Sequence, residues 1–175
     1  MLDGMLLPGP HGGSIVAFER RIDRPVEKVW AALTVPERVA DWLAKADIVL
    51  EVGGRYDLRF PDSEDVMWGM ITRLEPPELL ELTWRENDGT TKSVLSWRLS
   101  PDGGGCRLNL THTFPADTRD LPGFVSGWHW HLDAITAACD GVATAWDKGR
   151  WKALDERYRP RLSPPTSSAG PPAAG

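Results

Sequence analysis

The chain has little cysteine, no long apolar run and no concentration of positive charge. Its 175 residues include two cysteines, Cys106 and Cys139, which stand far apart and outside any CxxC pair. A small secreted domain held together by disulfides would normally carry more of them. The sequence therefore favours a reducing compartment, and it contains no cysteine-based metal motif.

The sequence also lacks a stretch long enough to cross a membrane. A transmembrane helix needs about 20 consecutive apolar residues, and no run in this chain approaches that length. The first residues have no basic start and are interrupted by Pro and Gly, unlike a secretory signal peptide. We therefore expect a cytoplasmic protein that is not inserted in a membrane.

The chain also has fewer positively than negatively charged residues. The 20 Lys and Arg residues are outnumbered by 25 Asp and Glu residues, which gives a net charge of -5 and an isoelectric point of about 5.4. The Lys and Arg residues form no cluster, and a field of this sign repels polyanions. We expect no nucleic-acid partner.

Both ends of the chain are poor in residues that a core could bury. Residues 1–13 are rich in Gly and Pro, and residues 159–175 consist largely of Pro, Ser, Ala and Gly. Such segments cannot offset the entropy lost on ordering. The sequence predicts disordered tails over 1–13 and 159–175, and one domain over 14–158.

Within that domain the apolar period changes twice. Residues 15–22 alternate as a strand, and two short helical patterns follow, with Pro25 and Pro36 near their starts. Alternation then returns and predicts six more strands, within residues 46–52, 55–60, 66–75, 78–86, 90–100 and 106–114. Pro76 and Pro77 separate the middle pair.

A helical stripe closes the domain. Apolar residues recur at steps of four and three, which predicts one long helix, at Trp128, Leu132, Ile135, Cys139, Val142 and Trp146. The order of elements predicts an α+β fold, in which a curved antiparallel sheet of about seven strands packs against a long C-terminal helix.

Five stretches carry a family resemblance. They are RPVEKVWAALTVPERVADWL, VGGRYDLRF, WGMITRLEPPELLELTW, LTHTF and SGWHWHLDAI. In this order they resemble the domain family named for the C-terminal part of the activator of heat-shock-protein-90 ATPase, within the START-like or SRPBCC superfamily. The resemblance covers Ile15 to Trp146.

The resemblance implies the helix-grip fold, with a deep and largely apolar cavity between the sheet and the long helix. Members of the superfamily use this cavity for carrying ligands or for enzymes of lipid or polyketide chemistry, and others contact chaperones. The chain departs from its relatives at Phe124, where they often carry a polar residue, commonly His. A polar site at that position is therefore not expected here.

His112 is the titratable residue that the strand pattern places inside. Alternation over 106–114 puts Leu108, Leu110, His112 and Phe114 on one face. Such a ring could anchor a polar group of a ligand. It could equally be a core histidine with a hydrogen-bonding partner, because buried polar groups normally find one. The residues leave both roles open.

Two more histidines stand two positions apart in the predicted helix. A helix places His129 and His131 about 200° apart, so they cannot bind one metal ion together. His129 precedes Asp133 by four residues, which predicts an exposed ion pair. His131 shares the face of Trp128 and is either half-buried against backbone or directed at a ligand. We predict no metal site and no cofactor.

The aromatic content completes the pocket hypothesis. The chain has 9 tryptophans and 2 tyrosines, and indole rings can wall a cavity while donating one N–H each. We therefore predict a ligand-binding set in which His112 and His131 are the polar members. The others are Trp42, Trp68, Trp84, Trp97, Phe114, Trp128, Leu132 and Ile135.

Catalytic signals are weak by comparison. The sequence has no GxSxG motif, no phosphate-binding loop and no clear pair of carboxylates, so we assign no catalytic residue. The leading hypothesis is a binding protein for a small hydrophobic or aromatic molecule. The alternatives are an enzyme of the cyclase, dehydratase or hydrolase kind that uses pocket histidines, and a module that contacts a chaperone or another protein. Both a monomer and a dimer are compatible with the sequence.

Overall fold

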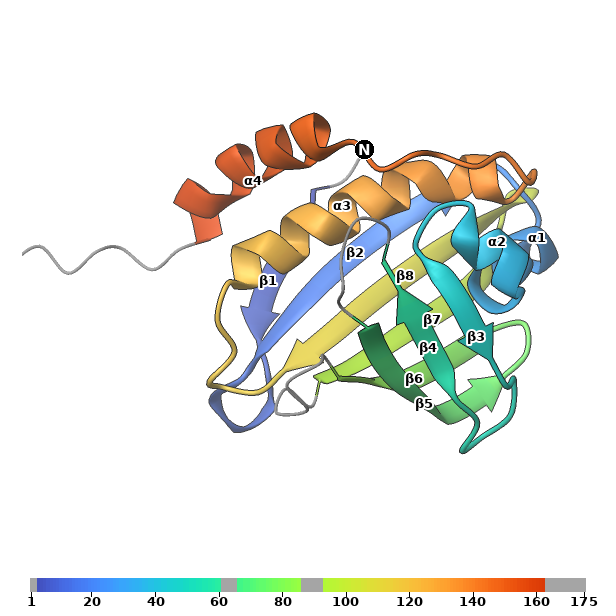
Figure 1. Cartoon of the computed structure of the whole chain (residues 1–175), viewed down its shortest axis with the longest axis horizontal. Coiled ribbons are helices and arrows are strands. Elements are labelled where there is room, and N and C mark those ends of the chain that lie inside the picture. Colours follow the sequence, from blue (N-terminus) through green and yellow to red (C-terminus); the bar gives the residue numbers. More distant parts are fainter. Residues whose placement is uncertain (1–2, 61–65, 86–92, 163–175) are drawn as a thin grey trace, which may run out of the picture.

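The computed structural model describes residues 3–60, 66–85 and 93–162. Its centre is one antiparallel sheet with the strand order β1-β2-β8-β7-β6-β5-β4-β3. Figure 1 shows this sheet curving around helix α3. The strands are β1 (Met5–Pro8), β2 (Ser14–Ile22), β3 (Lys45–Ile48), β4 (Tyr56–Arg59), β5 (Val66–Glu75), β6 (Leu79–Arg85), β7 (Ser93–Asp102) and β8 (Gly105–Phe114).

Four α-helices accompany the sheet. The helices are α1 (Val26–Thr34), α2 (Pro36–Ala40), α3 (Leu121–Ala138) and α4 (Lys148–Leu162), with a 3₁₀ turn at Pro10–Gly12. The predicted α+β helix-grip architecture is confirmed, including the two short helices after the strand that the sequence placed first.

The core lies between the concave face of the sheet and α3. Alternation along β8 buries Leu108, Leu110 and Phe114, while α3 buries Trp128 and Ile135 against them. Side chains at every second strand position and along one helical stripe thus meet in a single apolar layer. This layer fixes where α3 crosses the sheet.

The predicted N-terminal tail is partly wrong. Met5–Pro8 forms strand β1, which pairs with β2 so that Leu6 lies opposite Val16. Proline is tolerated at the end of an edge strand because no ladder hydrogen bond from its nitrogen is needed there. The sheet therefore has eight strands among the described residues, one more than the sequence predicts.

The predicted β3 arm is also too long. β3 ends at Ile48, and the apolar residues that follow are exposed, with 42% exposure at Leu50 and 64% at Val52. The chain turns away because Gly53 donates its N–H to the carbonyl of Ile71, 2.8 Å away, in β5. Residues 49–55 thus form a loop tied to β5.

The long helix ends earlier than its apolar stripe. Gly141 adopts a left-handed φ of 74°, and its N–H binds the carbonyl of Ala138 at 3.0 Å. The N–H of Val142 binds the carbonyl of Ala137 at 3.0 Å, which completes the hydrogen-bond pattern of a glycine-terminated helix. The predicted continuation to Trp146 is therefore wrong, because this glycine turns the chain back over α3.

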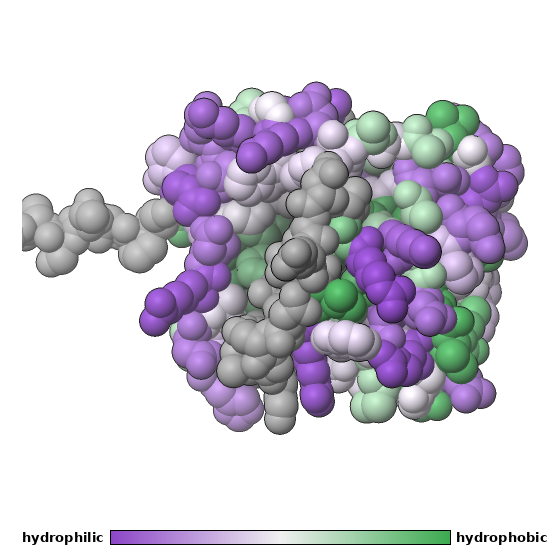
Figure 2. Space-filling model, viewed as in Figure 1, coloured by the Kyte–Doolittle hydropathy of each residue, from purple (hydrophilic) through white to green (hydrophobic). Residues whose placement is uncertain are grey.

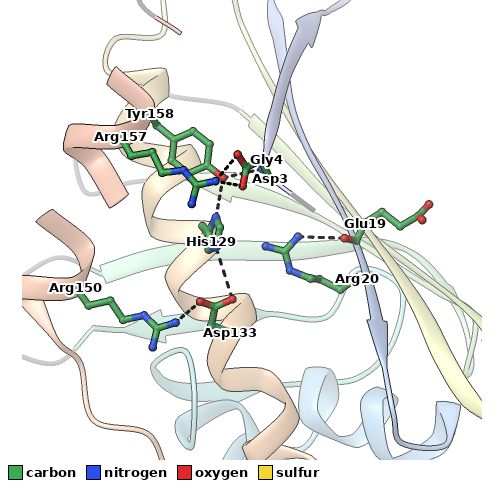
Figure 3. Close-up of polar contacts among 9 residues, drawn as sticks. All are labelled: Asp3, Gly4, Glu19, Arg20, His129, Asp133, Arg150, Arg157 and Tyr158. Carbon is green, nitrogen blue, oxygen red and sulfur yellow. Dashed lines mark hydrogen bonds and ion pairs between the residues drawn. The ribbon is translucent and has the colours of Figure 1, made fainter. Parts of the chain in front are cut away.

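Helix α4 then lies along the outer side of α3 (Figure 1). The buried residue of this helix is Tyr158, whose hydroxyl is 2.7 Å from His129 Nδ1 and accepts the N–H of Gly4 at 2.8 Å. Figure 3 shows that these three groups come from α4, α3 and the N-terminal segment. One hydroxyl thus connects three parts of the chain.

Ion pairs surround this contact. Arg150 of α4 pairs with Asp133 of α3, and Arg157 pairs with Asp3 (Figure 3). Because α4 extends to Leu162, the tail predicted from residue 159 begins inside a helix, and residues 163–175 lie outside the described residues.

Candidate functional site: a cavity between the sheet and helix α3

A cavity of about 630 Å³ lies between the sheet and α3. Figure 2 shows apolar surface near the middle of the corresponding face, bordered by hydrophilic residues. The volume is in the usual range for small-molecule sites. The cavity is lined by Leu43, Phe60, Val66, Met67, Trp84, Arg119, Asp120, Gly123, Phe124, Gly127, Trp128, His131 and Trp151.

Four of the lining rings form a cluster in which each ring contacts two of the others. The centroids of Trp84 and Trp128 are 5.5 Å apart, and those of Trp128 and His131 are 6.2 Å apart. The centroid of the Phe60 ring lies 6.3 Å from the centroids of both Trp84 and His131. The rings come from β6, α3 and the residue after β4, so the wall of the cavity is aromatic and built from distant parts of the chain.

His131 supplies a polar atom to this wall. Its Nδ1 is 2.8 Å from the carbonyl oxygen of Trp42, and the residue is 9% exposed. Burial lowers the pKa of His131 to about 4, so the ring is uncharged at neutral pH. The sequence left open a backbone contact or a place facing a ligand; the backbone contact is present, and the residue also lines the cavity.

His112 has a different environment and is absent from the cavity lining. Trp128 donates its indole N–H to Nδ1 at 3.1 Å, which leaves the proton of the neutral ring on Nε2. Nε2 then donates to the hydroxyl of Ser93 at 2.8 Å, and Ser93 donates to the carbonyl of Trp84. Both ring nitrogens are therefore satisfied inside the core, and burial lowers the pKa of His112 to about 3.

The structure divides the other predicted site residues into three groups. Trp84 and Trp128 line the cavity. Trp68 does not, because it is 41% exposed on the outer face of β5 with the guanidinium of Arg55 at 5.0 Å from its ring, and its predicted interior position is wrong. The buried core, outside the lining, contains Trp42, Trp97, Phe114, Leu132 and Ile135.

The error at Trp68 has a simple cause. β5 has large apolar residues at both phases of its alternation, with Met67 and Ile71 in one phase and Trp68 and Met70 in the other. Alternation alone cannot choose between them. The smaller and more aliphatic set, Met67 and Ile71, is buried.

His129 was expected to be exposed, and this prediction is wrong. Its exposure is 2%, because Tyr158 of α4 covers it (Figure 3). The contact with Asp133 exists, with Nε2 3.7 Å from a carboxylate oxygen. Because the sequence did not predict α4, no pattern within α3 could have shown that Tyr158 covers His129.

Several lining residues were missed by the sequence reasoning. Phe60 follows β4, Phe124 is the residue that departs from the resemblance noted above, and Trp151 comes from α4. Their aromatic side chains add to the apolar wall of the cavity. A spacing of three, four and four residues from Trp151 to Leu154, Tyr158 and Leu162 was the signal for the helix that carries the last of them.

Two charges stand at the start of α3 beside the cavity. Arg119 and Asp120 both line it, so their formal charges cancel there. Asp120 adopts a left-handed φ of 54° and binds Arg159 of α4 at 2.7 Å. The cavity is therefore apolar inside and charged at one end, and α4 is linked to that end.

Comparison with known proteins agrees with this architecture. The model of the family described as "Activator of Hsp90 ATPase homolog 1-like protein" matches residues 23–140. The chain belongs to this family. None of the curated proteins matches it.

Solved structures extend the similarity beyond the matched segment. CalU16 from Micromonospora echinospora is 26% identical with a TM-score of 0.72, and the match covers 90% of this chain and 96% of CalU16. Protein MLL2253 from Mesorhizobium loti is 29% identical with a TM-score of 0.65, over 72% of this chain and 96% of that one. DynU16, described as a putative protein in the dynemicin biosynthetic locus, is 20% identical with a TM-score of 0.66, over 72% and 47%, and shows a shared fold.

Two further observations bound the site. Across residues 3–60, 66–85 and 93–162, no helix has the length and apolar content needed to cross a membrane. The same part of the chain brings together no group of three or more His, Cys, Asp or Glu side chains that could hold a metal ion.

Proposed function

We propose that this protein binds a small hydrophobic or aromatic molecule in the cavity between the sheet and α3. The observation that carries the proposal is the cluster of four contacting rings, Phe60, Trp84, Trp128 and His131, in the lining of a cavity of about 630 Å³. Aromatic walls of this kind offer large apolar contact at little conformational cost. The helix-grip family supports the same role.

A binding role is favoured over catalysis by the few reactive groups near the cavity. Of the described residues that line it, His131, Arg119 and Asp120 can carry charge, and the two charged residues sit together at one end. General acid–base chemistry usually needs positioned groups with pKa values near the working pH. A pKa of about 4 makes His131 a hydrogen-bond acceptor rather than a proton shuttle at neutral pH.

Gly127 offers a direct test. It lines the cavity, and a Cβ added there would meet no atom within 4 Å. Gly127→Leu should therefore fill part of the cavity without disturbing the backbone, and Gly127→Ala is the matched control. Either change should stabilise α3 by up to about 1 kcal/mol, because glycine is a poor helix former.

The measurement is titration with N-phenyl-1-naphthylamine, an uncharged probe whose fluorescence rises in apolar sites. We expect saturable binding of one probe per chain in the wild type and in Gly127→Ala, and loss of binding in Gly127→Leu. Native mass spectrometry of the freshly purified protein would detect a retained ligand. Equal binding by all three proteins would show that the probe binds elsewhere and would refute the proposal.

A further inference from the structure

The hydrogen-bond partner of His131 determines where its proton lies. Nδ1 is 2.8 Å from the carbonyl oxygen of Trp42, and a carbonyl oxygen can only accept. Nδ1 must therefore carry the hydrogen. In the neutral ring this leaves a lone pair on Nε2, which makes that atom an acceptor.

Neighbouring rings hold the imidazole in this orientation. Trp146 stacks on it with centroids 5.5 Å apart and an interplanar angle of 30°. Trp130 and Trp42 meet it edge to face at 5.0 and 6.2 Å. Rotating the ring by 180° would put a C–H group against the Trp42 carbonyl and lose the hydrogen bond. The acceptor position is thus fixed before any ligand arrives.

The edge of the ring that carries Nε2 is the one left for the cavity. His131 lines the cavity, whereas Trp42, which occupies the Nδ1 edge, does not. No described residue hydrogen-bonds Nε2, and this atom is not among the fully enclosed polar atoms of the described residues that lack a partner, so it keeps access to open space. Because His131 lines the cavity, a ligand group that donates a hydrogen bond can reach this acceptor from the cavity.

We propose that the ligand is an uncharged, largely aromatic molecule with a hydroxyl group that donates to His131 Nε2. This inference rests on the proposed function and specifies its ligand. A carboxylate would face the lone pair of a neutral ring and be repelled. A ligand with only carbonyl oxygens would leave Nε2 unpaired. The charged lining residues Arg119 and Asp120 carry opposite charges, and Asp120 is paired with Arg159 of α4.

The test compares two probes of nearly equal size, 2-naphthol and 2-methylnaphthalene, by isothermal titration calorimetry at pH 7. The quantity of interest is the Kd of the methyl compound divided by the Kd of the naphthol. This ratio should be about 2- to 10-fold higher in the wild type than in His131→Phe, which is the usual size of one hydrogen bond. Trp68→Phe, on the outer face, is the control and should keep the wild-type ratio.

A second measurement uses the wild-type protein alone, in case His131→Phe folds poorly. In long-range ¹H–¹⁵N spectra, the unprotonated nitrogen of His131 should shift toward the protonated range when 2-naphthol is added and stay in place with 2-methylnaphthalene. Equal ratios in wild type and variant, or an unmoved nitrogen signal with naphthol bound, would overturn the hydroxyl inference and leave the cavity proposal standing. Failure of both probes to bind the wild type would overturn both.

Discussion

The hydroxyl of Tyr158 lies 2.7 Å from Nδ1 of His129 and joins the last helix to the helix beneath it. The same oxygen accepts the N–H of Gly4 at 2.8 Å, so one hydroxyl makes two hydrogen bonds to separate parts of the chain. Most of the remaining polar contacts of α4 are ion pairs of exposed arginines, which contribute little individually. Tyr158 is therefore the main polar attachment of α4.

The first prediction follows from this contact. Tyr158→Phe keeps the ring but removes both hydrogen bonds, leaving Gly4 N–H and His129 Nδ1 buried without a partner. The docking of α4 should weaken by about 1–3 kcal/mol. Hydrogen exchange followed by mass spectrometry should show faster exchange in 148–162, with little change in the strands β6 to β8. Uniformly faster exchange would mean that α4 does not open independently.

The second prediction concerns the internal network of His112. Ser93→Ala removes the hydroxyl that accepts from His112 Nε2 and leaves this buried N–H without its partner at a residue that is 1% exposed. The free energy of unfolding should fall by about 1–3 kcal/mol. Urea unfolding should show a lower midpoint with an unchanged slope. Ser100→Ala, on the exposed face of the same strand, is the control and should stay within about 0.5 kcal/mol of the wild type.

The third prediction is a loss of stability in weak acid. The pKa of His112 is lowered to about 3 and that of His131 to about 4, whereas an unfolded histidine titrates near 6.5. Between these values the unfolded chain binds more protons than the native one, so stability decreases as the pH falls below about 6.5. Each histidine contributes a slope of about 1.4 kcal/mol per pH unit.

Urea midpoints at pH 7, 6 and 5 measure this effect. His131→Phe removes one of the two groups, so its stability should decline less steeply than that of the wild type. Parallel declines in the two proteins would contradict a depressed pKa at His131. His129, whose pKa burial also lowers, contributes in the same direction to both proteins and cancels in the comparison.

The fourth prediction separates the tryptophans that face the cavity from those that do not. Trp84→Phe should reduce the ligand-induced change in protein fluorescence and weaken binding several-fold, because it removes apolar contact from the wall. Trp68→Phe should change neither, since Trp68 lies on the outer face under Arg55. Reversed results would place the ligand on the outside of the sheet.

The architecture was largely predictable because most elements have a clean apolar period. Alternation in 15–22 and 106–114 predicted two central strands, and Pro25 and Pro36 marked the starts of the short helices. The end of α3 was less clear. Its stripe continues in sequence to Trp146, yet Gly141 stops the helix. A single glycine with positive φ outweighed several apolar residues at helical spacing.

The candidate site was predictable only in part, because its wall is built from elements that meet through the fold. Trp84, Trp128 and His131 were expected and do line the cavity. His112 shows what the alternation of residues along a single strand cannot predict. Its face was right, but whether a buried ring meets a ligand or a neighbour depends on Trp128 and Ser93, which lie in other elements. Trp151 could not be predicted as a lining residue because it belongs to a helix that the sequence analysis did not predict.

Helix α4 contributes one side of the cavity wall from outside the layer formed by the sheet and α3. The family model ends at residue 140, whereas Trp151, which lines the cavity, comes from 148–162. The sheet and α3 form the layer that holds the fold together, and α4 adds to its outside through Tyr158 and surface ion pairs. Changes at Trp151 can thus reshape one side of the cavity without altering a residue of the sheet or of α3. Evolution and protein engineering share this route, since both can vary what the cavity admits while leaving the sheet and α3 unchanged.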